Sequence, residues 1–429
     1  MTRRKTPGPL HAAFVAVLTA AALYLGTMTS PTPIMHRAHA QPTVACNTLP
    51  GAIYIAGSSA ARPLIREAQR ALILAGESVT YVYQGTASCD GPSAVINNTL
   101  TTATANYFTF TDATMASTVV TNTCTLPITG IHPDIAVSDV TAAACGRNLS
   151  GTFDIPAGMV ELPGAVQSMT FVVPTASTAT SISGEAARIV YGFGGMTHTI
   201  TPWTVAMEII HRPPTSGTQI MIGETIGLHS SVWQGNALAT STNVRDAVLA
   251  ASAAGIGILA SDIADANRAH LRILAYQHIG QSCGYLPDSS ATALDKVNVR
   301  EGRYGIWSPT RYIVNVDGSG HAVPQTSTSA MAVQRGLDFL TFRNLTPAHT
   351  QIMITAAATA STVPQCAMHA TRASEAATPV LAEPAQPCHC LFESLRGTPP
   401  GQTACHACTM DSDCPTTAHT CRFNFCEGH

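Results

Sequence analysis

Short apolar runs alternate with helical patterns along most of the chain. Seven runs have the length and apolar character of buried strands: 52–56, 79–83, 134–137, 167–173, 256–259, 271–276 and 312–316. Apolar residues recur every three or four positions in four longer stretches, which we predict to be helices: 60–74, 183–191, 244–253 and 330–343. Strands that alternate with helices predict an α/β protein. Residues 99–130 are Thr-rich and polar, so we expect a surface hairpin or loop there.

The first forty residues are typical of an export signal. A basic start at 3–5 precedes an apolar run at 12–25, and Ala-His-Ala at 38–40 matches an A-x-A cleavage pattern. The apolar run is too short for a membrane span. A lipobox ending at Cys46 is a weaker alternative, because Cys46 lies far past that run. We expect cleavage near Ala40 and a periplasmic or secreted protein with no membrane insertion.

The charge balance limits the classes of ligand. Residues 1–40 hold four of the 22 Lys and Arg residues and none of the 25 Asp and Glu residues, which leaves a mature chain of formal charge −7. This charge argues against nucleic acid and against an anionic membrane surface. A small anion remains possible, because backbone N–H groups and one buried arginine can bind it on an acidic protein.

All 13 cysteines follow residue 40, which favours an oxidising compartment and disulfides, with one thiol left over. We expect Cys124 to pair with Cys145. Residues 367–387 are rich in Ala, Pro and Glu and are predicted to be a linker. Residues 388–429 then hold seven cysteines and form a Cys-rich module. Zinc ligation is compatible with this spacing, but an oxidising context favours disulfides, so we expect no metal and no cofactor.

The stretch from Arg212 to Gln219 has the composition of an anion site. The arginine offers a rigid fork of donors that matches a tetrahedral oxyanion. Ser216, Gly217 and Thr218 lie where a helix would begin, so free N–H groups and the helix dipole would point at the anion. The alternative is an ordinary capped helix with a solvent-facing arginine.

Three further polar positions lie where strands end or helices begin, which is where ligands bind in open α/β folds. They are Ser59 together with the N–H of Ala60, Ser88 and Asp139. Turn formation or helix capping is the alternative for each, and Asp139 could cap a helix that starts near Val140. The sixteen histidines show no ligand-like i, i+4 pair, and the three tryptophans are expected in the core.

Together these motifs resemble the periplasmic phosphate-binding component of ABC transporters, a type 2 periplasmic binding protein, over residues 51–345. The similarity rests on these segments in this order: Ile55-Ala56-Gly57-Ser58-Ser59 with Pro63-Leu64, Tyr83 to Ser88, Ala136 to Asp139, Arg212-x-x-x-Ser216-Gly217-Thr218, and Ala254 to Ile258. The resemblance implies two α/β lobes joined by two crossover strands, with a ligand cleft between them. We expect one lobe at 41–168 plus 300–366 and the other at 169–299.

The resemblance also implies a role for each matched residue. The donors would be Ser59, Ala60 (N–H only), Ser88, Arg212, Ser216, Gly217 and Thr218. Asp139 would accept a hydrogen bond from a protonated phosphate oxygen and so reject fully ionised sulfate. This chain departs from the family pattern at Ala60, where an aromatic residue is usual, and at Asp90, which adds an acidic group.

The resulting expectation is a monomeric, exported solute-binding protein that captures phosphate or a similar oxyanion and delivers it to an ABC permease. An enzyme is not expected, because the sequence shows no G-x-S-x-G elbow, no legible nucleophile grouping and no Gly-rich nucleotide loop. Two alternatives remain open. One is a secreted or surface interaction protein that uses the Cys-rich module for recognition or adhesion, and the other is a sensor that presents ligand status to a receptor.

Overall fold

The computed structural model describes residues 44–112, 114, 116–398, 405–415 and 420–427. The export signal predicted for residues 1–40 lies outside the described residues. No helix within the described ranges has both the length and the apolar character needed to cross a bilayer.

The first lobe is built on a parallel core of strands. β2 (Ala52–Ser58) pairs in parallel with β3 (Thr80–Thr86) on one side and with β6 (Ile135–Ser138) on the other. All seven residues of β2 are buried, as expected for a strand covered on both faces. The helices of this part of the first lobe are α2 (Arg62–Leu74), α3 (Asp90–Ile96) and α4 (Ala142–Asn148).

The Thr-rich segment 99–130 forms the expected hairpin and widens the same sheet. β4 (Thr104–Phe110) pairs antiparallel with β5 (Val119–Thr125), and β4 joins β3. The short strand β1 (Val44–Ala45) runs parallel to β5 at the edge. The hairpin therefore extends the sheet rather than lying apart from it.

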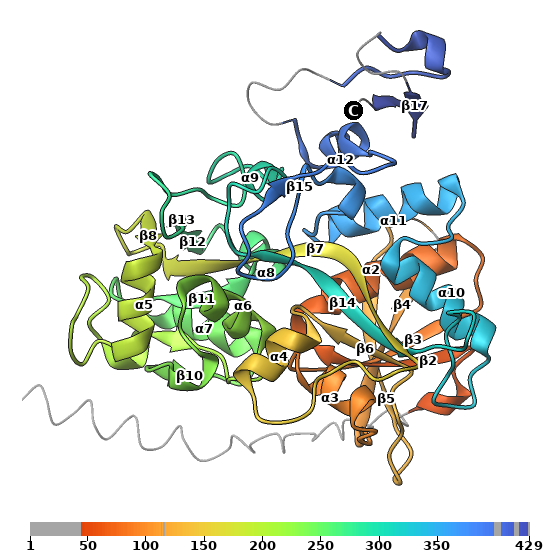
Figure 1. The fold of residues 1–429 in the computed structure, drawn as a ribbon, viewed down its shortest axis with the longest axis horizontal. Helices are drawn as coiled ribbons and strands as arrows, with labels where there is room; N and C mark the ends of the chain where they lie inside the picture. Colours follow the sequence, from red (N-terminus) through yellow and green to blue (C-terminus); the bar gives the residue numbers. More distant parts are fainter. Residues whose placement is uncertain (1–43, 113, 115, 399–404, 416–419, 428–429) are drawn as a thin grey trace, which may run out of the picture. The chain divides into compact units, whose positions relative to one another are not determined.

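Two strands connect the lobes (Figure 1). β7 (Met159–Pro174) is 16 residues long, and its first part pairs with β14 (Trp307–Asn315), which also pairs with β6. The end of β7 pairs instead with β11 (Gly257–Ala260) and β12 (Leu271–Ile273) in the second lobe. This arrangement confirms the predicted α/β fold of two lobes joined by crossover strands.

Helices and short strands surround β11 and β12 in the second lobe. The helices are α5 (Gly184–Phe193), α6 (Gly217–Ile226), α7 (Ser241–Ala250) and α8 (Ser261–Ala266). The strands are β8 (Ser181–Ser183), β9 (Ile210–His211), β10 (Asn236–Ala237) and β13 (Ala275–Gln277). The three tryptophans are buried, as predicted, at positions 203, 233 and 307.

Beyond the second lobe the chain returns to the first and then forms the C-terminal part. The helices are α9 (Val297–Arg300), α10 (Ala330–Thr341), α11 (Pro347–Thr359) and α12 (His389–Arg396). The strands are β15 (Ala370–Thr371), β16 (Val380–Leu381), β17 (Thr420–Arg422) and β18 (Phe425–Glu427). Short 3-10 helices are Cys46–Thr48, Ser59–Ala61, Ala206–Glu208, Ser230–Val232, Gln365–Ala367 and Asp411–Asp413.

The cysteine pairing corrects one expectation. Cys124 pairs with Cys46 and not with Cys145. The pairing of β1 with β5 places Val44 opposite Cys124, and Cys46 follows only two residues later. Cys145 in α4 pairs with Cys89 at the start of α3. Four more disulfides form among the described residues: Cys366–Cys388, Cys390–Cys405, Cys408–Cys421 and Cys414–Cys426. Cys283 is the expected unpaired thiol and is exposed.

The C-terminal part is anchored to the body by buried contacts. The guanidinium of Arg300 donates from Nε to the carbonyl of Ala367 at 2.9 Å and forms an ion pair with Glu393 of α12 at 3.1 Å. Phe392 is fully buried in the main core. The segment 367–387, predicted to be a linker, holds the β15–β16 hairpin and is flanked by the two cysteines of one disulfide, Cys366 and Cys388.

Candidate functional site

The two lobes meet at the first residue of α6. A Cβ added to Gly217 would lie 2.2 Å from Ser88 Oγ and 2.9 Å from Asp139 Cβ, so no larger residue fits this approach. Beside it, the backbone N–H of Cys89 donates to the carbonyl of Thr215 at 3.2 Å. These contacts join the α3 end of the first lobe to the α6 end of the second, and they describe a closed arrangement.

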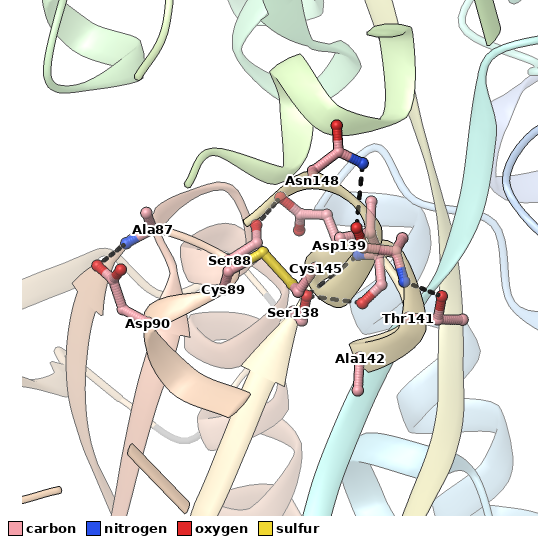
Figure 2. Close-up of a disulfide and its surroundings, with 12 residues drawn as sticks. Ala87, Ser88, Cys89, Asp90, Ser138, Asp139, Thr141, Ala142, Cys145 and Asn148 are labelled. Carbon is pink, nitrogen blue, oxygen red and sulfur yellow. Dashed lines mark hydrogen bonds between the residues drawn. A yellow bond between two sulfur atoms is a disulfide. The ribbon is translucent and has the colours of Figure 1, made fainter. Parts of the chain in front are cut away.

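Asp139 is the central acceptor on the first lobe. It follows β6 directly, and its Oδ2 accepts hydrogen bonds from Ser58 Oγ at 2.7 Å and Ser88 Oγ at 2.9 Å. Figure 2 shows Ser88 and Asp139 facing each other next to the Cys89–Cys145 disulfide. Asp139 does not cap a helix, because α4 is capped by Thr141.

The carboxylate of Asp139 is only 1% exposed, and its Oδ1 has no hydrogen-bond partner among the described residues. Burial raises its pKa, while hydrogen bonds from the two serines and the charge of Arg212 act in the opposite direction. One oxygen of this carboxylate is therefore held by two serine hydroxyls, and the other has no partner among the described residues.

Arg212 is the central donor on the second lobe. It is 2% exposed and is held by its own lobe, with Nη1 donating to Ser241 Oγ at 2.6 Å and Nη2 to the carbonyl of Ala239 at 3.0 Å. Its Nε has no partner within the described part of the chain. Burial lowers the pKa of Arg212 to about 10, and the charge of Asp139 acts against that shift.

Arg212 and Asp139 influence each other electrostatically without forming an ion pair, as judged over the described residues. A buried charge without a contacting partner is costly, and so is a buried polar atom without a hydrogen bond. Arg212 Nε and Asp139 Oδ1 both lack a hydrogen-bond partner among the described residues, and they belong to opposite lobes. A ligand that accepts from Nε and donates to Oδ1 would remove both costs.

The first turn of α6 supplies further donors. Ser216 is the N-cap residue, and its side chain makes no capping bond. The N–H of Ser216 donates to the carbonyl of Pro213 at 3.0 Å and is therefore not free, contrary to what the sequence had suggested. The next N–H bond runs from Ile220 to the carbonyl of Ser216, so the N–H groups of Gly217, Thr218 and Gln219 have no partner in the described chain. The helix dipole adds positive potential at this end. The helix therefore begins where the sequence predicted, at Ser216 and Gly217.

The turn after β2 differs by one position from the prediction. Ser58 donates to Asp139, and its Oγ accepts from the N–H of Ala60 at 3.1 Å. The N–H of Ala60 is therefore already used. The hydroxyl of Ser59 is half-buried and makes no hydrogen bond within the described residues, so it remains available. Gly57 has φ +132°, and a Cβ there would lie 2.0 Å from the carbonyl oxygen of Val137.

A second buried carboxylate next to the site was not anticipated from the sequence. Asp262 is the second residue of α8, just after β11, and its Oδ1 accepts from Gln167 Nε2 at 3.0 Å. The same Nε2 reaches the carbonyl of Ala60 at 3.3 Å. Burial, followed by the charge of Asp139 among other contributions, raises the pKa of Asp262 to about 7. The one sequence feature that could have pointed to Asp262 is its position just after the predicted strand 256–259.

The raised pKa of Asp262 predicts a specific pH dependence of stability. Between its ordinary value of 3.8 and about 7, the folded protein holds a proton that the unfolded chain releases. Stability should therefore fall as pH rises through this window, with a slope of up to about 1.4 kcal/mol per pH unit. Asp262→Asn should remove the contribution of this group to the slope. Urea unfolding between pH 4.5 and 7.5 measures it, with exposed Asp246→Asn as control, and parallel curves for wild type and Asp262→Asn would contradict the assignment.

Comparisons with known proteins give structural similarities only. No family model matches the chain, and no curated protein matches it. A candidate phosphate ABC transporter substrate-binding protein with bound phosphate, from Clostridium perfringens, is 12% identical and aligns over 73% of this chain and 99% of its own, with a TM-score of 0.48. An ABC-type phosphate transport receptor from Vibrio cholerae is 14% identical over 72% and 99%, with a TM-score of 0.43.

A third similar structure has a different role. It is the regulatory domain of CcmR from Synechocystis PCC6803 in complex with 2-PG, 12% identical over 68% of this chain and 96% of its own, with a TM-score of 0.37. All three TM-scores lie below 0.5 and all identities below 25%. These similarities assign neither the family nor the ligand of this chain. The candidate site is instead inferred from the contacts of Asp139, Arg212 and the start of α6.

Proposed function

We propose that this protein is an oxyanion-binding protein of the type 2 periplasmic class, which closes its two lobes around phosphate. One observation carries the proposal. A buried donor, Arg212 Nε, and a buried acceptor, Asp139 Oδ1, lie on opposite lobes without partners among the described residues. Each unmatched group costs about 1–3 kcal/mol, and a ligand that can both accept and donate relieves both.

Protonated phosphate fits this pair better than sulfate. Hydrogen phosphate keeps an O–H near neutral pH and can donate to Asp139, whereas sulfate has no proton to give and would meet a buried carboxylate oxygen. Asp262 adds a second acidic group, protonated below about pH 7. The proton preference of the site is therefore attributed to Asp139, whose free oxygen favours a ligand that brings its own proton.

We propose two roles for the predicted residues. Direct contacts are proposed for Ser59, Asp139, Arg212, Ser216, Gly217 and Thr218. Ser88 and Ser58 act instead as positioning residues, because both hydroxyls donate to Asp139 Oδ2 and orient its other oxygen. Ala60 drops from the donor set, since its N–H already donates to Ser58 Oγ. The proposed anion therefore bridges the lobes through the first turn of α6.

The proposed lobes are 41–168 with 300–366 and 169–299, closing about β7 and β14. Only closure brings Gly217 against Ser88, so an anion held there would favour the closed state. The six disulfides fit an exported protein. The sequence motifs imply an ABC permease as the partner that recognises the closed form.

Calorimetry with phosphate and sulfate tests the proposal. Wild-type protein, stripped of bound anion by unfolding and refolding with its disulfides intact, should bind one phosphate and no sulfate. Asp139→Asn should bind sulfate at least about tenfold more tightly than wild type, because the repulsion is removed and an N–H donor is gained. The exposed Asp246→Asn serves as control. Absence of phosphate binding by refolded wild type would overturn the proposal.

A further inference from the structure

Two histidines and one glutamate gather around a single point in the C-terminal segment, outside the interlobe site. His369 Nδ1 lies 3.0 Å from Glu383 Oε1, and His389 Nε2 lies 3.4 Å from Glu383 Oε2. The imidazole rings stack with centroids 3.8 Å apart and planes 11° apart. One nitrogen of each ring and a carboxylate oxygen all lie within 4.8 Å of one another.

The backbone holds these three side chains in place. The N–H of His369 donates to the carbonyl of Arg300 at 2.8 Å, and the N–H of Ala382 donates to the carbonyl of His369 at 3.1 Å. The β15–β16 pairing therefore places Glu383 beside His369. His389 follows Cys388, whose disulfide to Cys366 ties the start of α12 to the same region. The donor set is organised before any ion binds.

The donor types and spacings suit a metal ion. Two imidazole nitrogens and one carboxylate are a ligand set that zinc uses when its fourth position stays open. With zinc bonds of about 2.0–2.2 Å, tetrahedral donor atoms lie about 3.3 Å apart. The two carboxylate-to-imidazole distances, 3.0 and 3.4 Å, bracket this value. These two distances go to different oxygens of Glu383, and small side-chain rotations would bring the three donors around one ion, since one donor atom of each residue lies within 4.8 Å of the others.

We propose that His369 Nδ1, Glu383 and His389 Nε2 bind one divalent first-row transition metal ion of the zinc type. Glu383 is 46% exposed and lines a cavity of about 690 Å³, so the ion can enter and keep a water in its open position. The oxidising environment that the disulfides indicate suits an ion without redox chemistry. The nearby cation Arg300 is already neutralised by Glu393.

An ordinary ion pair explains this cluster less well. Two stacked imidazoles facing one carboxylate cannot both be protonated without repelling each other, whereas a metal ion engages all three groups at once. His389 Nδ1 is buried without a partner in the described chain, so this ligand lacks the usual outer-shell acceptor. Loss of such an acceptor weakens metal binding by about 10–100-fold. We therefore expect a site weaker than a fully supported zinc centre.

Titration with Zn²⁺ and with Co²⁺ tests the site. Tag-free full chain with intact disulfides is used in phosphate-free buffer, and every variant carries Cys283→Ser to remove the exposed thiol as a competing ligand. We expect one Zn²⁺ per chain and a visible Co²⁺ absorption band of four- or five-coordinate type. His369→Ala and Glu383→Gln should each weaken binding by at least about 100-fold, since a direct ligand counts for more than an outer-shell group.

His321→Ala is the matched control, because His321 also lies near a carboxylate, Asp317 at 3.7 Å, but belongs to no group of three possible metal ligands in the described part of the chain. It should bind Zn²⁺ like the parent protein. Unfolding midpoints measured without metal show whether the ligand variants keep their fold. Absence of stoichiometric Zn²⁺ binding by the parent, or binding unchanged in folded His369→Ala and Glu383→Gln, would overturn the proposal. Neither result depends on phosphate binding.

Discussion

Arg212→Met should lower phosphate affinity by at least about 100-fold while leaving the fold intact. Methionine fills similar space but removes the buried cation of the second lobe whose charge acts on Asp139. Removing one member of a buried charge arrangement costs about 3–5 kcal/mol, and about 1.4 kcal/mol corresponds to a factor of ten in affinity. Calorimetry with phosphate measures the loss.

The matched control for this prediction is Arg245→Met. Arg245 is an arginine of the same lobe that pairs with its exposed neighbour Asp246 at 2.7 Å. Its replacement should leave phosphate affinity unchanged. If folded Arg212→Met retained affinity within about tenfold of wild type, Arg212 would not be the charge that holds the anion.

Gly217→Ala should prevent full closure and weaken phosphate binding by about tenfold or more. The added methyl would collide with Ser88 Oγ at 2.2 Å, Ser88 Cβ at 2.7 Å and Asp139 Cβ at 2.9 Å. Rotation of the Ser88 side chain would relieve only the collision with Oγ, because Cβ would stay in place. It would also break the hydrogen bond from Ser88 Oγ to Asp139. Overpacking of this kind costs about 1–3 kcal/mol, and here the cost falls on the closed state alone.

Small-angle scattering and calorimetry together measure this effect. Wild-type protein should become more compact when phosphate is added, and Gly217→Ala should compact less at the same ligand saturation. Gly192→Ala is the control, because its Cβ would meet only Leu228 Cδ1 at an ordinary 3.7 Å. Equal compaction and equal affinity in wild type and Gly217→Ala would show that closure does not bring α6 against Ser88.

The sequence predicts most of the framework because local patterns determine it. Apolar runs located the core strands β2, β3 and β6, and the Ser-Gly-Thr turn located the start of α6. α11 was not predicted, because its Ala- and Thr-rich sequence is apolar on all sides rather than along one stripe. Its burial comes from packing against α2, which a single sequence does not reveal.

Parts of the site depend on register and on distant contacts, and these were predicted less well. The Gly-Ser-Ser turn offers two serines, and a shift of one residue decides which of them faces Asp139. Asp262 reaches the site through Gln167 on the crossover strand β7. That contact joins residues 95 positions apart and has no local signal.

The cysteine and histidine contacts show the same limit. The pairing of Cys46 with Cys124 depends on the edge strand β1, and a two-residue strand leaves no periodic pattern in a sequence. The histidines at 369 and 389 are 20 positions apart, so a search for i, i+4 pairs could not find them. The hairpin and the disulfide between them create the cluster.

A crystal structure of the protein with arsenate tests the central claim most directly. Arsenate has the shape and protonation of phosphate, and its arsenic atom can be located by anomalous scattering. We predict one strong anomalous peak between the lobes, with ligand oxygens within hydrogen-bonding distance of Arg212 Nε, Asp139 Oδ1 and the N–H groups at the start of α6. Saturating arsenate with no peak at that position, or with a peak only elsewhere, would contradict the account.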